Sequence, residues 1–499
     1  MLKKGLFSLF VCLLLTPFSF CQSLEEQLFQ IFEENELMGL SVAIKTDQQL
    51  LDFHFGQRDY SRDLAVTSQT RFRIASISKT FTALGLMRLH DLGLFELDED
   101  VSGYLGFQVR NPNFPQQPIT FRMLLSHQSS LQDGSGYPDF LNATYQESPV
   151  PTIDELLLPS GAYYTENLWR SESPGSFFAY SNLNFGLIGA LIEALSGQRF
   201  DVYMKTQILE PLQIGGSYNV LDLDDIDQVA VLYRFNEKWE AQFDHYKGVY
   251  PPPRDLQDYQ PGTNGLIFAP QGGLRASALE VNRMLHLFSA GDATSIGISS
   301  QTLEEITSAQ WSYNGKNGDN YFGLFNKWGL GLHLANNSED DAICQSISWG
   351  PFLGHPGEAY GLVSDAYFDP EQGTGLVLII NGKQSGYQSG ENSSFYQIEE
   401  VIFETVCSYW DDLLSVQTSA VNELSISPNP ASDRILLHNP GTSVYSLHIK
   451  DIHGRISLSS WEINPGNRHI ELPDLSAGLY FVEIVGNNDK KVIKLLIQQ

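Results

Sequence analysis

The sequence predicts a large α/β domain of the α+β kind, followed by a small β-sandwich. Three observations predict it. Residues 39–55 alternate apolar and polar side chains, as strands do. Three later segments are apolar over the length of a helix. From residue 424 onward, short alternating segments are separated by turn residues. We therefore expect helices and strands together in residues 22–412, and strands alone in residues 424–499.

The three helical segments are residues 77–89, 182–195 and 278–288. The first is apolar on nearly every side, so we expect it to be buried. Two strands are expected late in the large domain, at residues 361–368 and 375–380. The residues between them, 369–375, are rich in turn formers.

Residues 413–423 mix polar and small residues and predict a linker. Beyond it, Tyr445, Leu447 and Ile449 alternate with polar neighbours, which indicates a strand with one buried face. About 75 residues of this texture predict a small β-sandwich.

The composition suits a folded protein with a large core. Of 499 residues, 42% are hydrophobic and 18% are charged, and the net charge is −29. So acidic a surface repels phosphate backbones, which makes nucleic acid a poor candidate partner.

The first 21 residues resemble an export signal. Lys3 and Lys4 precede an apolar run that is too short to span a membrane comfortably. Ser19 and Cys21 fit a cut before Gln22. The alternative is a lipid anchor on Cys21. No later stretch reaches the ~18 apolar residues of a spanning helix, so the mature chain is expected to have no transmembrane span.

After that cut, two cysteines remain, Cys344 and Cys407. An oxidising exterior permits a disulfide between them. Two buried free thiols are the alternative, and spacing alone does not decide between them.

The strongest chemical signal is Ser76-Ile-Ser-Lys79 at the start of the first predicted helix. Residues three apart share one helix face, so the hydroxyl and the amine would meet. A hydroxyl needs a neighbour that takes its proton, and a lysine can do so if burial lowers its pKa toward 7. The alternative is a chance occurrence of this short pattern.

Two further pieces strengthen the signal. Tyr180-Ser-Asn182 precedes the second predicted helix and offers a phenol and an amide, although a helix-capping asparagine is the alternative. His355-Pro-Gly357 leads into a late strand, where glycine lets a substrate approach closely. For His355 the alternative is a histidine in a surface loop.

In this order, the three pieces resemble the motifs of the serine β-lactamase and D,D-peptidase superfamily, in its class C-like branch. Residues 119–131, 180–197, 270–277 and 328–331 resemble other stretches of that family, and the resemblance covers residues 25–410. It implies a β-lactamase/transpeptidase-like fold: an antiparallel sheet flanked by helices, plus a helical subdomain, with the active site between them.

The resemblance also implies roles. Ser76 would form an acyl-enzyme, Lys79 would accept or relay its proton, and Tyr180 would serve as base and acid. The implied substrate-binding residues are Asn182, which holds the substrate amide, and His355, Gly357 and Glu358. The oxyanion hole would come from the backbone N–H groups of residues 76 and 358. His127 would position a loop.

Departures from the family pattern bear on the substrate. His355 stands where class C β-lactamases have lysine, which weakens the case for β-lactam hydrolysis. Glu358 is acidic where a small residue is frequent, and could repel a substrate carboxylate. Arg275 could compensate, but we expect it to be an ordinary exposed arginine.

The tail has a resemblance of its own. Residues 426–434 and 475–484 and the final Lys494-Leu-Leu-Ile-Gln-Gln resemble the C-terminal sorting domain of the type IX secretion pathway. This implies the secretion machinery as a partner and a secreted or surface location after export through the periplasm. A sandwich that binds carbohydrate or protein is the alternative.

The expected function is a secreted serine hydrolase that cleaves an ester or amide in a small-molecule or peptide substrate. Esters or D-amino-acid amides rank first, β-lactams second and cell-wall carboxypeptidase substrates third. This chemistry requires no metal or organic cofactor. The alternative is a non-catalytic binding protein that retains the fold.

Overall fold

The computed structural model describes residues 22–498, apart from 47–48, 338, 348, 422–424, 440–444, 452–454, 464–465, 473–474 and 486–489. The chain divides into two compact units between Cys407 and Ser408. The predicted signal peptide lies outside the described residues.

A nine-stranded sheet organises the first unit, and every neighbouring pair in it is antiparallel. The predicted antiparallel sheet is therefore confirmed, including strands at both segments expected late in the domain. In spatial order the strands are β3 (Leu64–Ala65), β2 (Leu50–Asp59), β1 (Gly39–Lys45), β13 (Thr374–Ile380), β12 (Leu362–Asp369), β11 (Phe352–Ala359), β10 (His333–Ala335), β9 (Lys327–Trp328) and β8 (Trp311–Ser312).

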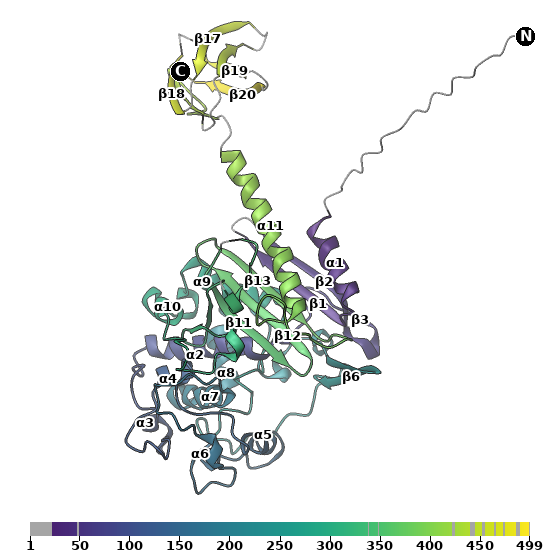
Figure 1. Ribbon diagram of the computed structural model, residues 1–499, viewed down its shortest axis with the longest axis vertical. Helices are drawn as coiled ribbons and strands as arrows, with labels where there is room; N and C mark the ends of the chain where they lie inside the picture. The colour runs from purple at the N-terminus through teal and green to yellow at the C-terminus, as the bar shows by residue number, and fades with distance from the viewer. Residues whose placement is uncertain are drawn as a thin grey trace, which may run out of the picture. The chain divides into compact units, whose positions relative to one another are not determined.

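The three predicted helices are present as α2 (Ser78–Asp91), α7 (Asn182–Ser196) and α9 (Ala278–Ala290). α9 packs on β1, β12 and β13, whereas α2 packs on α7. As expected from its apolar character on all sides, α2 is almost entirely buried. Figure 1 shows the helical subdomain below the sheet. The remaining helices up to residue 307 are α1 (Leu24–Glu34), α3 (Ser102–Leu105), α4 (Phe121–Leu125), α5 (Tyr137–Gln146), α6 (Asp154–Leu157), α8 (Phe200–Met204) and α10 (Ser300–Thr307).

The last helix is α11 (Gln397–Val421), which was not among the helices predicted from the sequence. It continues through most of residues 413–423, which the sequence suggested as a linker. The physical reason is that residues 397–421 contain neither proline nor glycine, so nothing in them breaks a helix.

A disulfide joins Cys344 to Cys407 on α11, with the two Cα atoms 5.7 Å apart. Of the two alternatives left open by the sequence, the structure therefore has the bridge.

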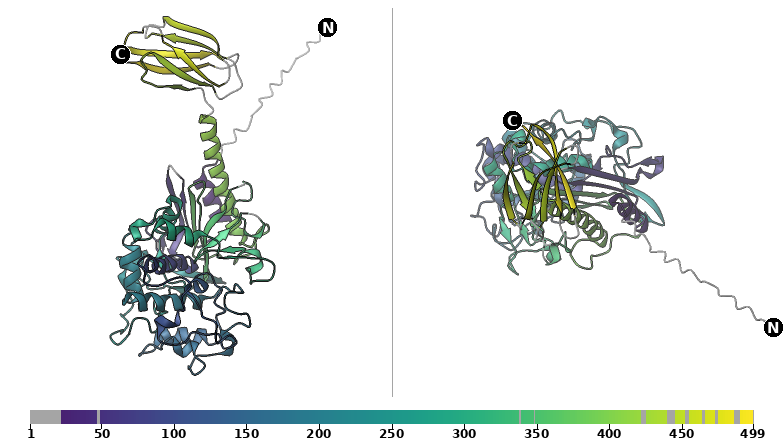
Figure 2. Two further views of the ribbon diagram at one scale, coloured as in Figure 1. Left: turned by 90° about the vertical axis from the view of Figure 1, so that its left-hand side faces the viewer. Right: turned by 90° about the horizontal axis from the view of Figure 1, so that it is seen from above.

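The second unit contains two sheets around one apolar core, which confirms the predicted β-sandwich. Its strands are visible in Figure 2. The buried core takes residues from both sheets, among them Ile435 and Leu437 from one and Leu447 and Val482 from the other. One sheet is β14 (Ser425–Ser427), β15 (Arg434–Asn439) and β18 (Gly466–Glu471); the other is β17 (Ile456–Ile463), β16 (Tyr445–Lys450), β19 (Gly478–Val485) and β20 (Lys490–Ile497).

Across the described part of the chain, no helix combines the length and the apolar character that a bilayer span demands.

Candidate active site

Ser76 lies in a short 3₁₀ turn, Ala75–Ile77, that leads directly into α2. Ala75 adopts a φ of 48°, a left-handed conformation that costs a non-glycine residue about 1–3 kcal/mol. Lys79 follows in the first turn of α2, and its Nζ lies 3.0 Å from Ser76 Oγ. The predicted meeting of hydroxyl and amine is present.

Lys79 is completely buried, and two further oxygens surround its amine. Nζ donates to Asn182 Oδ1 at 2.8 Å and to the Gln271 carbonyl oxygen at 2.9 Å. Burial lowers the pKa of Lys79 to about 7, and the nearby charge of Asp133 opposes that shift. The amine is therefore neutral in a large fraction of molecules near neutral pH.

Tyr180 lies just before α7, with its ring 4.8 Å from Lys79 Nζ. Its phenol hydrogen-bonds to the Ser76 side chain. Burial raises the pKa of Tyr180 above its usual value, and the bond to Ser76 opposes this only in part. At neutral pH the phenol keeps its proton.

Asn182 is the first residue of α7, and Asp133 fixes its side chain. Asn182 Nδ2 donates to Asp133 Oδ2 at 2.8 Å, which leaves Oδ1 to face Lys79. Asp133 also accepts the backbone N–H groups of Asn182 and Leu183, at 3.2 and 2.9 Å. Asp133, and not Asn182, thus caps the helix. Asp133 could not be predicted from the sequence, because its 49-residue separation from Asn182 leaves no local pattern.

His355 lies within β11 and is 1% exposed, so it is not a histidine of a surface loop. Its Nδ1 lies 2.6 Å from the Pro356 carbonyl oxygen, which can only accept, so Nδ1 carries the hydrogen. Nε2 is then an acceptor, and it has no hydrogen-bond partner among the described residues. Burial, with Lys79 nearby, holds the pKa of His355 well below its usual value, and the ring is neutral.

Gly357 lets β11 lie close to the 3₁₀ turn that contains Ser76. A methyl group at this position would lie 2.5 Å from Ser364 Oγ, 2.8 Å from the Ile74 carbonyl oxygen and 3.3 Å from the Ser76 nitrogen. Any larger residue would therefore push the strand away. The next side chain, Glu358, is exposed and accepts a 2.9 Å hydrogen bond from the Tyr396 phenol.

Arg275 is not exposed, so that expectation is wrong. It lies in β7 (Arg275–Ala276), 6% exposed, and its guanidinium donates to both oxygens of Asp244 at 2.7 and 3.1 Å. Burial of a charged guanidinium is costly, and the pairing with Asp244 offsets that cost for Arg275. Its charge is not available to a substrate carboxylate.

His127 is buried beside the start of α7, where its Nδ1 accepts the Ser181 backbone N–H at 3.2 Å. This contact fits the expected role in positioning a loop.

A cavity of about 430 Å³ lies over these groups. Of the seven predicted site residues, all but the buried Lys79 line it. Most of its remaining lining comes from two segments, residues 321–325 and 394–399, which were not predicted to belong to the site. The full lining is Ser76, Asp133, Tyr180, Asn182, Tyr321, Phe322, Leu324, Phe325, His355, Pro356, Gly357, Glu358, Val363, Ser394, Phe395, Tyr396 and Glu399.

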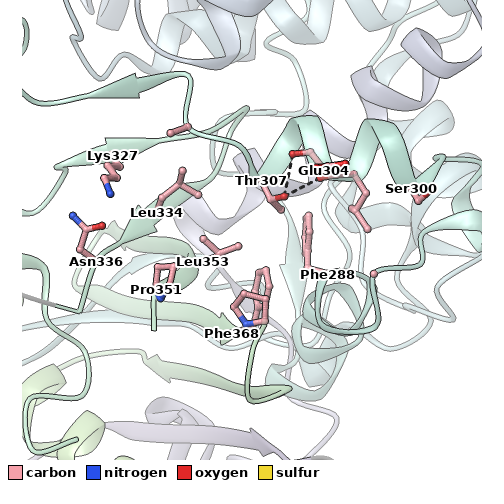
Figure 3. Close-up of a pocket in the computed structure, with 14 residues that line it drawn as sticks. Phe288, Ser300, Glu304, Thr307, Lys327, Leu334, Asn336, Pro351, Leu353 and Phe368 are labelled. Atoms are coloured by element: carbon pink, nitrogen blue, oxygen red, sulfur yellow. Dashed lines mark hydrogen bonds between the residues drawn. The ribbon is translucent and has the colours of Figure 1, made fainter. Parts of the chain in front are cut away.

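A second cavity, of about 410 Å³, shares no lining residue with the first. It is mainly apolar, with the rings of Phe288 and Phe368 stacked 5.2 Å apart (Figure 3). Ser76 and the residues that surround it take no part in this cavity.

Comparison of the sequence with known families agrees with this fold. Residues 24–393 match the family described as Beta-lactamase. The chain therefore belongs to the β-lactamase family. Residues 425–498 match the secretion system C-terminal sorting domain, which indicates a secreted or cell-surface protein.

Individual relatives are distant. Penicillin-binding protein 4* of Bacillus subtilis (strain 168) is 27% identical over 239 residues, which are 47% of this chain and 48% of that protein. Protein flp of Staphylococcus aureus (strain MRSA252) is 25% identical over 183 residues, 36% of this chain and 35% of that protein. The chain thus spans about half the length of the first relative and about a third of the second.

Solved structures share the fold. D-amino acid amidase from Ochrobactrum anthropi SV3, complexed with L-phenylalanine amide, has a TM-score of 0.52 at 20% identity, over 79% of this chain and all of that one. A class C β-lactamase has a TM-score of 0.54 at 16% identity, over 77% of this chain and 96% of that one.

Proposed function

We propose that the protein is a secreted serine hydrolase that cleaves an ester or amide through an acyl-enzyme on Ser76. The observation that carries this proposal is the 3.0 Å contact between Ser76 Oγ and the buried Lys79 Nζ. A buried lysine with a pKa of about 7 is a proton acceptor at neutral pH, as a nucleophilic serine requires.

The surroundings of Lys79 orient its lone pair. Asn182 Oδ1 points at the Lys79 amine because Asp133 binds the other end of the Asn182 amide. The Gln271 carbonyl oxygen also accepts a hydrogen bond from this amine. A neutral amine has two hydrogens, and these two oxygens take both. The lone pair then faces Ser76 Oγ and can take the hydroxyl proton as the oxygen attacks the substrate carbonyl.

Tyr180 would act chiefly as the acid. Its phenol is protonated at neutral pH, so it can donate to the leaving group as the substrate bond breaks and recover a proton from Lys79. The backbone N–H groups of Ser76 and Glu358 would donate hydrogen bonds to the oxyanion. In other enzymes, loss of one such donor raises the activation barrier by about 3 kcal/mol. Water then hydrolyses the acyl-enzyme.

Among substrates, we rank esters or D-amino-acid amides first, β-lactams second and cell-wall carboxypeptidase substrates third. The last two carry a carboxylate that needs a cationic partner. His355 is neutral and Arg275 is paired with Asp244, so neither supplies one.

Labelling with a serine-reactive phosphonate tests the proposal: the wild-type chain should label, and a Ser76→Ala variant should not. Equal labelling of the two would end the proposal and favour a non-catalytic binding protein. Parallel assays of nitrocefin, a p-nitrophenyl ester and a D-Ala-D-Ala peptide would order the substrates.

The C-terminal unit supports a proposal for where the hydrolase acts. Because residues 425–498 match a secretion sorting domain, we propose that the type IX machinery exports the hydrolase to the surface or the medium. Deletion of residues 425–499 should leave the protein inside the cell that makes it.

A further inference from the structure

Resting on the proposed hydrolase function, we propose that the active-site cavity selects substrates that carry a positively charged group, such as an ammonium, near the bond that is cleaved. Four features of the cavity wall support this inference: its acidic residues, its lack of a competing cation, a hydrogen-bond acceptor without a partner, and its aromatic rings.

The charged residues of the wall are all acids. Asp133, Glu358 and Glu399 line the cavity, and none of the described lining residues is an arginine or a lysine. Lys79 does not line the cavity, and it is neutral in a large fraction of molecules near pH 7. The wall therefore favours cations and repels anions.

Neither Arg275 nor Arg73 lines the cavity. Arg275 is bound to Asp244 by two hydrogen bonds. Arg73, three residues before the nucleophile, holds its guanidinium 4.3 Å from the ring centre of Phe243 and does not line the cavity.

Glu399 is paired with another acid rather than with a base. It is 4% exposed, and its neighbour is the completely buried Asp365 of β12. Burial and mutual repulsion raise the pKa of Asp365 well above its usual value, and burial raises that of Glu399 to about 7. Above pH 7 Glu399 is therefore mostly ionised, and burial opposes a second charge on Asp365, so Glu399 carries the negative charge of the pair. A cationic ligand would neutralise it.

His355 gives an independent indication of a donor ligand. Its Nδ1–H is bound to the Pro356 carbonyl oxygen, so only the acceptor atom Nε2 remains for a ligand, and within the described residues nothing else bonds to it. A carboxylate oxygen would bring its own lone pair against the lone pair of Nε2, and the two would repel each other. An N–H group would instead be accepted.

Aromatic rings complete the wall. Tyr321, Phe322 and Tyr396 line the cavity, and the Phe322 side chain is 96% exposed. Rings attract cations through the negative charge of their faces, most strongly for ammonium groups that give up water. Acids and aromatic rings together give the cavity a lining suited to an alkylammonium.

Three p-nitrophenyl esters with the same chain test the inference at pH 8. One acyl group ends in trimethylammonium, one in the isosteric tert-butyl group and one in a carboxylate. We expect kcat/KM to be at least about tenfold higher for the cation than for the neutral ester, and lowest for the anion. Equal values, or a preference for the anion, would overturn the inference.

Two variants locate the effect. Glu399→Gln should reduce the ratio of kcat/KM for the cationic ester to that for the neutral ester severalfold. Glu371→Gln makes the same charge change at an exposed turn residue outside the cavity, and should leave that ratio unchanged. An unchanged ratio in Glu399→Gln would contradict the assignment of that residue.

A binding measurement separates this inference from the hydrolase proposal. In Ser76→Ala, calorimetry compares the primary amides of the trimethylammonium and tert-butyl acids, which contain no p-nitrophenyl ester. If the wild type cleaves none of the esters, the hydrolase proposal fails, but tighter binding of the cationic amide would still support charge selection. Equal or weaker binding of the cation would overturn it.

Discussion

Asp133 accepts a 2.8 Å hydrogen bond from the side-chain amide of Asn182, and the other end of that amide accepts one from Lys79 at the same distance. A carboxylate on a loop thus fixes which end of Asn182 faces the lysine. Its charge also raises the pKa of Lys79 against the effect of burial. Asp133 thus acts in two ways on Lys79, the proton acceptor of the proposed mechanism.

Asp133→Asn should lower kcat/KM by about 10- to 100-fold, because an amide can leave Asn182 in the wrong orientation. Loss of the charge should also lower the pKa of Lys79 and move the acidic limb of the pH–rate profile to lower pH. Asp139→Asn, an exposed acid on α5, is the control and should behave as wild type. If the acidic limb of the pH–rate profile stayed at the same pH, the charge of Asp133 would not be coupled to the pKa of Lys79.

Lys79 should determine how the acylation rate depends on pH. If the neutral amine accepts the proton, as we propose, then its pKa of about 7 sets the pH dependence: kcat/KM for a neutral ester should rise about tenfold for each pH unit below 7 and level off above it. Lys79→Ala should slow acylation by orders of magnitude while circular dichroism shows an intact fold. Normal turnover in that variant would remove Lys79 from the mechanism.

Gly357→Ala should reduce both stability and activity. The added methyl would lie 2.5 Å from Ser364 Oγ and 2.8 Å from the Ile74 carbonyl oxygen, so β11 must move away from the nucleophile. We expect a loss of about 1–3 kcal/mol in unfolding free energy by denaturant titration and little phosphonate labelling. Gly103→Ala, in α3, has nothing within 4 Å of the new methyl and should cost nothing.

Glu399→Gln should stabilise the protein above pH 7. The pKa of Glu399 rises from 4.5 in the unfolded chain to about 7 in the folded one, so the wild type loses stability as pH rises between these values. The neutral glutamine avoids that loss, and its unfolding free energy at pH 8 should exceed that of the wild type by on the order of 1 kcal/mol. At pH 4 the two proteins should be nearly equal. If the variant were the less stable protein at pH 8, burial of the ionised Glu399 carboxylate would not be destabilising.

Removal of the disulfide should destabilise the first unit. Cys344 and Cys407 are 63 residues apart, and a loop of that length contributes about 4 kcal/mol by restricting the unfolded chain. A Cys344→Ala/Cys407→Ala variant should unfold at a clearly lower denaturant concentration than the oxidised wild type. Equal midpoints would show that the bridge contributes little to stability.

The sequence by itself determined the local chemistry and the elements that carry it. Ser76 and Lys79 are three residues apart on a helix, and that spacing alone makes them neighbours. The apolar patterns of α2, α7 and α9 and the turn between β12 and β13 are likewise short-range features. The composition of residues 413–423 suggests a linker but leaves its conformation open, and the absence of proline and glycine from residues 397–421 permits the helix that runs through most of it.

Only the tertiary structure decided which distant groups surround that pair. Asp133 acts on Asn182 from 49 residues away, Arg275 is buried because Asp244 pairs with it, and Glu399 from α11 joins Asp365 from β12 beside the cavity. These relationships depend on how strands and helices pack, and packing brings together residues that share no sequence pattern. The contact between Ser76 and Lys79 could therefore be predicted, whereas the charge of the cavity that surrounds them could not.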